Sequence, residues 1–288
     1  MFPRLVRRSL PRAKSKGVLC GLRLLLVAAS LPIPSFAQQS TYLGFDRNDY
    51  PGDPNLEILQ QTFSYAGYWL NNPPGETSNS WIGKRPLLES AGFGFLVLFN
   101  GKLDAQLQHN AAALGRSDGK AAAAAAKREG FPAHTIIFLD LEEGGRMLPE
   151  QKAYIYAWVD AVNTSGFRAG VYCSGIPVRE DKNTTINTAD DIRANAHGRE
   201  ITYWVTQDSC PPSPGCVFPK QPPGPSESKL RYAEVWQFVQ SPKRPEFAAK
   251  CGGYNQADES CYPPGVDPAS HLHVDVNTAT SADPSHGR

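Results

Sequence analysis

Short apolar runs recur along the chain between residues 42 and 276, and polar residues, glycine and proline separate them. Runs of this composition are typical of β-strands. Several are apolar throughout rather than alternating, which favours a parallel sheet buried on both faces. We predict strands at 42–45, 65–70, 93–99, 135–141, 168–172, 201–205, 233–238 and 273–276.

Two long helices are predicted between these strands. Residues 103–129 contain six consecutive alanines, which favour helix, and Gly130-Phe131-Pro132 ends the segment. Residues 149–164 begin with proline, carry apolar residues at helical spacing and stop before Gly166. Because strands alternate with helices, the pattern predicts an α/β fold, a single (β/α)8 TIM-type barrel spanning residues 38–277.

The last two crossovers of this barrel are predicted to be irregular. Residues 208–229 hold seven prolines, and residues 241–268 show no helical pattern. The following segment, residues 278–288, is small and polar, so we expect a disordered tail there.

Residues 1–37 have the pattern of a secretory signal peptide. A basic region precedes an apolar stretch at 18–31, and Ser35-Phe36-Ala37 offers small residues to a signal peptidase. A spanning helix needs roughly 20 apolar residues, which Arg23 and Pro32 interrupt, so we expect no stable membrane anchor. The mature protein is predicted to be secreted or periplasmic, and Arg7-Arg8 leaves twin-arginine export open.

The charge is unevenly distributed along the chain. The formal net charge is +1, but the first 37 residues hold seven Lys and Arg residues and no acid, so the remainder is acidic. Binding to nucleic acid needs a basic surface, so we exclude a nucleic-acid partner. The composition, 41% hydrophobic and 20% charged, is typical of a globular protein.

Five cysteines follow the predicted signal peptide, and disulfides persist in an oxidising compartment. Cys210 and Cys216 bracket a proline-rich turn, and Cys251 and Cys261 bracket a loop rich in glycine. We therefore predict disulfides 210–216 and 251–261, with Cys173 buried and free; the alternative is that all five are reduced. No paired Cys-x-x-Cys spacing occurs, which argues against a zinc site.

Acidic residues stand where predicted strands end, and barrel chemistry collects at those ends. Asp140 and Glu142 close the fourth strand and, two residues apart, point to the same inner side. Asp46 ends the first strand and Asp275 lies in the last. Since the first and last strands of a closed barrel are neighbours, Asp46 and Asp275 are expected side by side.

Crowded carboxylates repel one another, so one of them should keep a proton at neutral pH and serve as a general acid. A protonated acid beside an ionised carboxylate is the requirement of glycoside hydrolysis. The alternative is structural: Asp140 and Glu142 cap the following helix, or Glu142, Glu143 and Arg146 form a solvated cluster.

An ordered series of motifs spans residues 42–277. It reads Gly44-Phe45-Asp46, Phe138-Leu139-Asp140-Leu141-Glu142, Gly170-Val171-Tyr172-Cys173, Tyr203-Trp204-Val205, Val235-Trp236-Gln237-Phe238 and Val274-Asp275-Val276-Asn277. This series resembles family 25 glycoside hydrolases, lysozymes that cut the glycan strand of peptidoglycan. A closer resemblance, to the glycoside-hydrolase-like domain family, rests on Gly67-Tyr68-Trp69-Leu70-Asn71, Trp81-Ile82-Gly83-Lys84 and the Asp118-Gly119 before the alanine-rich helix.

The resemblance implies Glu142 as the general acid, with Asp140, Asp46 and Asp275 lining the cleavage site to position water and stabilise positive charge. It also implies that the acetamido group of the substrate assists. The chain departs from the lysozyme pattern at residues 73–80 and in the proline-rich insertion after Trp204.

Aromatic and amide side chains near the strand ends are candidates for substrate binding. Tyr172 and Trp204 can stack on sugar rings. Alternation puts one of Tyr68 and Trp69 inward, and we choose Tyr68. The polar residues at strand ends, Asn100 and Gln237, are expected either to bind substrate or to tie down loops, and most large aromatics are core.

Three functions remain open from the sequence. The first is a secreted glycosidase acting on a peptidoglycan-like polysaccharide, and the second is a non-catalytic wall-binding barrel. The third is a metal-dependent hydrolase using His271, His273 and Asp275, but the histidine pair reads more readily as structural than as a metal site. We therefore expect a monomer without metal or cofactor.

Overall fold

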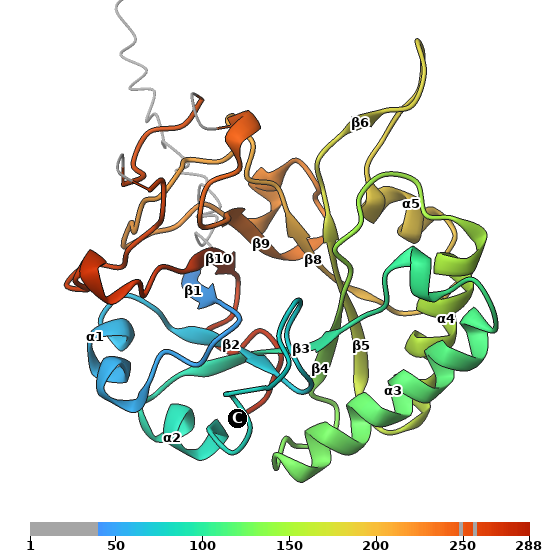
Figure 1. The fold of residues 1–288 in the computed structure, drawn as a ribbon, viewed down its shortest axis with the longest axis horizontal. Coiled ribbons are helices and arrows are strands. Elements are labelled where there is room, and N and C mark those ends of the chain that lie inside the picture. The colour runs from blue at the N-terminus through green and yellow to red at the C-terminus, as the bar shows by residue number, and fades with distance from the viewer. Residues whose placement is uncertain (1–39, 248–249, 256–257) are drawn as a thin grey trace, which may run out of the picture. The chain divides into compact units, whose positions relative to one another are not determined.

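Eight strands close into one barrel in the order β1-β10-β9-β8-β5-β4-β3-β2 (Figure 1), which confirms the predicted barrel. The computed structural model describes residues 40–247, 250–255 and 258–288, so the predicted signal peptide lies outside the described residues. The barrel strands are β1 (Tyr42–Asp46), β2 (Tyr65–Trp69), β3 (Gly94–Asn100), β4 (Ile136–Asp140), β5 (Arg168–Ser174), β8 (Thr202–Thr206), β9 (Ala233–Val239) and β10 (Asp275–Ala279).

The last strand runs against its neighbours. β10 pairs antiparallel with both β1 and β9, whereas the other barrel pairs are parallel. The expectation of a wholly parallel barrel was wrong here, because a parallel neighbour needs a crossover that returns to the opposite end of the sheet. Among the described residues between β9 and β10, the regular elements are two short 3₁₀ turns, Pro245–Phe247 and Pro268–Ser270. The segment therefore returns to the barrel at the end where β9 finishes.

Helices α3 (Ala111–Arg128) and α4 (Pro149–Thr164) lie beside β3, β4 and β5 (Figure 1). The prediction for α4 is confirmed at both ends. α3 begins later than predicted, because Asp104–Gln106 forms a separate 3₁₀ turn and Asn110 adopts a left-handed φ of 61°. The sequence did not predict α1 (Leu56–Gln60), α2 (Arg85–Ser90), α5 (Thr188–Ala194) or the hairpin of β6 (Val178–Arg179) and β7 (Thr185–Ile186).

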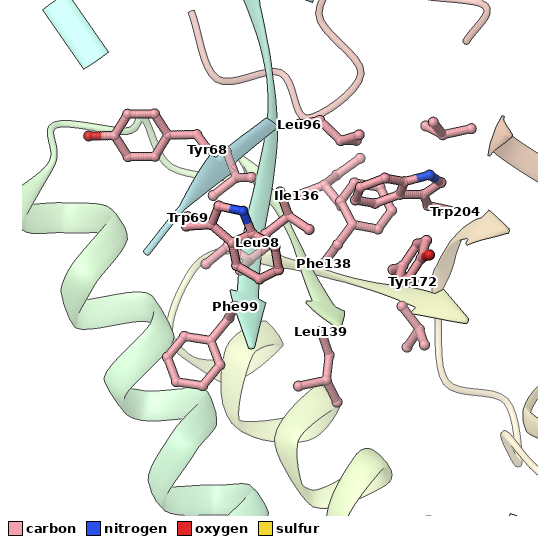
Figure 2. Close-up of a cluster of buried hydrophobic side chains, with 14 of the residues drawn as sticks. Tyr68, Trp69, Leu96, Leu98, Phe99, Ile136, Phe138, Leu139, Tyr172 and Trp204 are labelled. Atoms are coloured by element: carbon pink, nitrogen blue, oxygen red, sulfur yellow. The ribbon is translucent and has the colours of Figure 1, made fainter. Parts of the chain in front are cut away.

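Aromatic rings fill the barrel interior (Figure 2). Trp204 packs against Phe138 and Tyr172, with ring centroids 5.8 and 4.5 Å away. Gly170 makes this possible, because a Cβ there would lie 2.5 Å from the Phe138 ring. Phe99 points outward and packs against Trp158 of α4. The acidic cleft described below therefore rests on a closely packed aromatic floor.

The expectation of a disordered segment at 278–288 was wrong. β10 extends to Ala279, and Ser285 is fully buried against the amino ends of β3 and β4. Its backbone N–H donates to Phe95 O at 2.9 Å, and its carbonyl accepts from Ile136 N at 2.8 Å. Small polar residues give no sequence signal for such contacts, yet they satisfy strand groups that burial would otherwise leave unpaired.

Four cysteines join the two irregular crossovers. Cys210 pairs with Cys251 and Cys216 with Cys261, with Cα atoms 5.5 and 5.6 Å apart, while Cys173 is buried and free. The expected local pairing was wrong, because both crossovers stay at one end of the barrel and face each other.

The described helices include none with the length and apolar content to cross a membrane.

We predict that the double variant Cys216→Ser/Cys261→Ser loses about 2–4 kcal/mol of unfolding free energy, the usual contribution of one disulfide. Denaturant titration measures this loss. Because the variant removes a matched pair, its residues 38–288 should contain one free thiol, Cys173, after unfolding without reductant.

The matched control is Cys210→Ser/Cys216→Ser, which breaks both bridges and should expose three thiols in the same residues. Local pairing of Cys210 with Cys216 would reverse the two counts, and that result would refute the observed connectivity.

Candidate active site

A cleft of about 410 Å³ opens at the carboxyl ends of the parallel barrel strands. All four predicted acids line it: Asp46, Asp140, Glu142 and Asp275. A larger cavity of about 1150 Å³ lies at the other end, beside Ile136 and Arg168, the first residues of β4 and β5. That cavity contains none of the four acids, so we place the candidate site in the smaller cleft.

The antiparallel direction of β10 puts Asp275 at this cleft. Asp275 is the first residue of β10 and pairs in register with Asp46, the last residue of β1. Gly67 of β2 leaves room for Asp46 on its other side, because a Cβ there would lie 2.6 Å from the Asp46 Cβ. The two carboxylates therefore lie side by side, as the barrel topology predicted.

Asp46 is buried and held by two amides. Asn277 Nδ2 donates to its Oδ1 at 2.6 Å, and Gln237 Nε2 donates to the same oxygen at 3.1 Å. Burial raises the pKa of Asp46 to about 6, although both amide bonds favour the ionised form and act against this shift. Asp46 therefore gains or loses its proton at weakly acidic pH.

Gln237 connects three groups of the cleft. Its Nε2 also donates to Asp275 Oδ2 at 3.2 Å, and its Oε1 accepts from the Tyr172 hydroxyl at 2.7 Å. The other oxygen of Asp275 accepts from Ser241 N at 2.7 Å. Burial, followed by the nearby Asp46, raises the pKa of Asp275 well above its usual range.

Asp140 and Glu142 form a second carboxyl pair across the cleft. Asp140 is buried, and its Oδ2 has no hydrogen-bond donor among the described residues. Burial and the charge of Glu142 raise the pKa of Asp140 well above its usual range. Glu142 is more open to solvent, and partial loss of water raises its pKa as well. The raised pKa values of both groups favour a proton held between the two carboxyls.

Tyr172, Trp204 and Gln237 line the cleft as expected, and Tyr68 and Asn100 do not. Trp204 Nε1 donates to Asn277 Oδ1 at 2.9 Å, so the indole also supports the amide that binds Asp46. Gln237 and Trp204 are therefore parts of the network around Asp46.

Tyr68 faces away from the barrel interior, and the choice of Tyr68 over Trp69 was wrong. In Figure 2 Tyr68 points away from Trp204 and Tyr172. Its hydroxyl donates to Glu129 just after α3, and its ring packs 5.2 Å from Phe131. Trp69 lines the cleft instead. Alternation requires one of two neighbours to face inward, but it does not determine which one.

Asn100 ties down a loop. Its Nδ2 donates to Asn72 O at 2.9 Å, and its backbone N–H donates to Asn71 Oδ1 at 2.8 Å. Of the two roles considered for this residue, the structure supports the loop contact.

The sequence did not single out Arg47, Asp49 or Asn277 as site residues. Asn277 carried a usable signal, because it lies two positions after Asp275 and so shares its face of β10. Arg47 and Asp49 follow the end of β1 and lie in a loop. The alternation of side chains along a strand does not predict which way side chains in a loop point.

The described part of the chain holds no group of three or more His, Cys, Asp and Glu residues arranged for a metal ion. His273 lines the cleft, while His271 is exposed outside it. The metal-dependent hypothesis therefore has no geometric support.

Comparison with known proteins agrees with the resemblance inferred from the motifs. Residues 78–215 match the family model described as Rv2525c-like, glycoside hydrolase-like domain. This match covers a little under half of the chain; it contains Asp140 and Glu142, and Asp46 and Asp275 lie outside it. No curated protein matches the chain in sequence.

Solved structures are similar to the chain at low sequence identity. An uncharacterized B. stearothermophilus protein is 19% identical, with a TM-score of 0.52 over 83% of this chain and 95% of that one. The Tat-secreted protein Rv2525c of Mycobacterium tuberculosis is 15% identical, with a TM-score of 0.49 over 87% and 98%. The autolysin LytC of Streptococcus pneumoniae is 13% identical, with a TM-score of 0.46 over 83% and 46%.

We predict that Asn277→Leu raises the pKa of Asp46 above about 6, because the lost hydrogen bond stabilises the ionised form. NMR titration of the aspartate carboxyl carbons measures this shift. Asn100→Ala, which removes an amide outside the cleft, should leave the pKa of Asp46 unchanged. A fall in that pKa in Asn277→Leu would show that Asn277 does not stabilise the carboxylate.

Proposed function

We propose that this protein is a secreted glycoside hydrolase that cuts an amino-sugar polymer. The observation that carries the proposal is the meeting of two carboxyl pairs, Asp140 with Glu142 and Asp46 with Asp275, in one sugar-sized cleft. The match to a glycoside hydrolase-like family model supports it independently. Peptidoglycan is the first substrate to test, because the motif series resembles that of lysozymes.

Glu142 is our choice for the general acid. It is the more accessible member of the pair that shares a proton, so it can reach a glycosidic oxygen in the cleft. Proton transfer from Glu142 to that oxygen accompanies cleavage of the bond to the anomeric carbon. Before this transfer, ionised Asp140 accepts a hydrogen bond from protonated Glu142 and so holds the acid in place.

Positive charge that develops on the sugar needs an anion nearby. Asp46, which is anionic above about pH 6, lies across the cleft from Glu142 and is fixed by Gln237 and Asn277, so its charge is preorganised. In the mechanism that the family resemblance implies, the acetamido group of the substrate attacks the anomeric carbon, and water then opens the resulting ring. The two aspartates orient that group and water.

Secretion is proposed on the signal-like pattern of residues 1–37 together with the disulfides between the two crossovers. Disulfides of this kind persist in oxidising compartments.

A non-catalytic wall-binding barrel is the second candidate. One observation favours it: both oxygens of Asp46 and both of Asp275 already accept hydrogen bonds from the protein. Such saturation suits a structural network as well as a preorganised one, and the next experiment separates the two.

We predict that Glu142→Gln lowers the release of reducing ends from purified cell wall by about 10²–10⁴-fold, the usual contribution of a general acid. Glu143→Gln is the matched control, because Glu143 lies outside the cleft and binds Asp104 N and Gln151. It should keep activity within a few-fold of the wild type.

If wild type and Glu142→Gln both release nothing while co-sedimenting with the wall, the binding function is correct. Equal activity of the two proteins would instead remove Glu142 from the mechanism.

The pH dependence follows from Asp46. Its pKa is raised to about 6, so it is neutral below that pH and anionic above it. We predict that kcat/KM rises as pH increases through about 6 and falls at higher pH, where the Asp140–Glu142 pair loses its shared proton. In Asp46→Asn, kcat/KM should no longer rise as pH increases through about 6. A wild-type kcat/KM that falls as pH increases through about 6 would contradict the role of ionised Asp46.

A further inference from the structure

Arg47 carries a guanidinium group that the described protein does not engage. The side chain lines the cleft, but none of its nitrogens has a hydrogen bond or ion pair within the described ranges. Its Nε is shielded from solvent and lacks an acceptor. A guanidinium offers five N–H donors, and leaving such donors without acceptors costs free energy, so the site has capacity for a ligand with acceptor atoms.

The backbone beneath Arg47 is firmly held. Trp69 Nε1 donates to Arg47 O at 3.1 Å, and Trp81 Nε1 donates to the next carbonyl, that of Asn48, at 2.8 Å. Both indoles are buried. Because this backbone segment is already held in place, binding a ligand at Arg47 costs less conformational entropy.

Arg47 is also the one permanent cation among the described residues that line the cleft. The other basic side chain there, His273, has its pKa lowered by burial and by the positive charge of Arg47. Burial meanwhile raises the pKa values of Asp140 and Asp275, which reduces the negative charge that the cleft presents. An anion can therefore approach Arg47 without meeting a uniformly negative surface.

The charge and shape of a guanidinium suit a carboxylate. Its planar fork can donate two parallel N–H bonds to the two oxygens of one carboxylate. Asp49 and Asp275 lie near enough to act on the charge of Arg47, but neither comes within ion-pair distance among the described contacts. The N–H donors of the Arg47 guanidinium can therefore bind a carboxylate of a ligand.

We infer that Arg47 binds a carboxylate carried by the glycan, and that the cleft therefore selects acidic sugars over neutral ones. This inference rests on the proposed function only for the identity of the cleft as a glycan site. The carboxylate has two possible sources, an acid substituent on the sugar itself or a peptide attached to that sugar.

The test measures dissociation constants by calorimetry, and every protein compared, including the one called wild type in this test, carries Glu142→Gln so that the probes are not cut. Three probes of equal length are compared: a neutral N-acetylglucosamine oligomer, the peptide-free wall glycan with a carboxylate on alternate sugars, and the same glycan carrying peptides. Wild type should bind at least one acidic probe about 10-fold or more tightly than the neutral one, as expected for a charge-assisted bond.

Arg47→Gln should bring the ratio of the dissociation constants for the neutral and acidic probes close to one. Arg47→Lys should keep part of the preference for the acidic probe. Preference for the peptide-free glycan identifies the sugar substituent as the source, and preference confined to the peptide-bearing glycan identifies the peptide. Arg146→Gln is the matched control, since it removes one positive charge outside the cleft, where Arg146 pairs with Glu180; its selectivity should match the wild type.

Equal affinity of wild type for all three probes would overturn the inference, as would unchanged selectivity in Arg47→Gln. Failure to bind any probe would overturn it together with the proposed function. Tight but unselective binding, together with cleavage by the protein that keeps Glu142, would exclude only the selective role of Arg47. The hydrolase proposal would still stand.

Discussion

The antiparallel pairing of β10 with β1 is the constraint on which the site depends. It brings Asp275 from the start of its strand to the same end of the barrel as Asp46, which finishes its own. The same strand supplies Asn277, two residues further in, which binds both Asp46 and Trp204. With β10 in the parallel direction, Asp275 would lie at the amino ends of the other strands, and the cleft would lose one of its four predicted acids.

Buried carboxylates in such numbers are costly, and two devices reduce the cost. Amide donors from Gln237 and Asn277 replace water around Asp46 and Asp275. For Asp140 and Glu142, which have fewer donors, the raised pKa values favour the protonated form instead. The result is a cleft that holds neutral and ionised acids next to each other, which is the arrangement that acid-catalysed bond cleavage requires.

Local periodicity was enough to predict the eight strands, α4 and the inward position of Asp140 and Glu142, because each depends on the spacing of residues within one segment. Three of the errors concern contacts between distant segments. The direction of β10, the cross-linking of the two crossovers and the burial of Ser285 all depend on where the chain returns in space. Tyr68 and Trp69 differ only in phase along one strand, and both are large aromatics, so composition could not decide between them.

The central claim is that the four acids act together on a single glycan bond. A crystal structure of Glu142→Gln with a bound wall-glycan fragment tests it most directly. The account predicts a glycosidic oxygen within hydrogen-bond distance of the side chain at position 142, with one flanking sugar against Asp46 and Asp275. A fragment bound in the larger cavity beside Arg168, or bound in the cleft with its glycosidic oxygens beyond the reach of position 142, would contradict it.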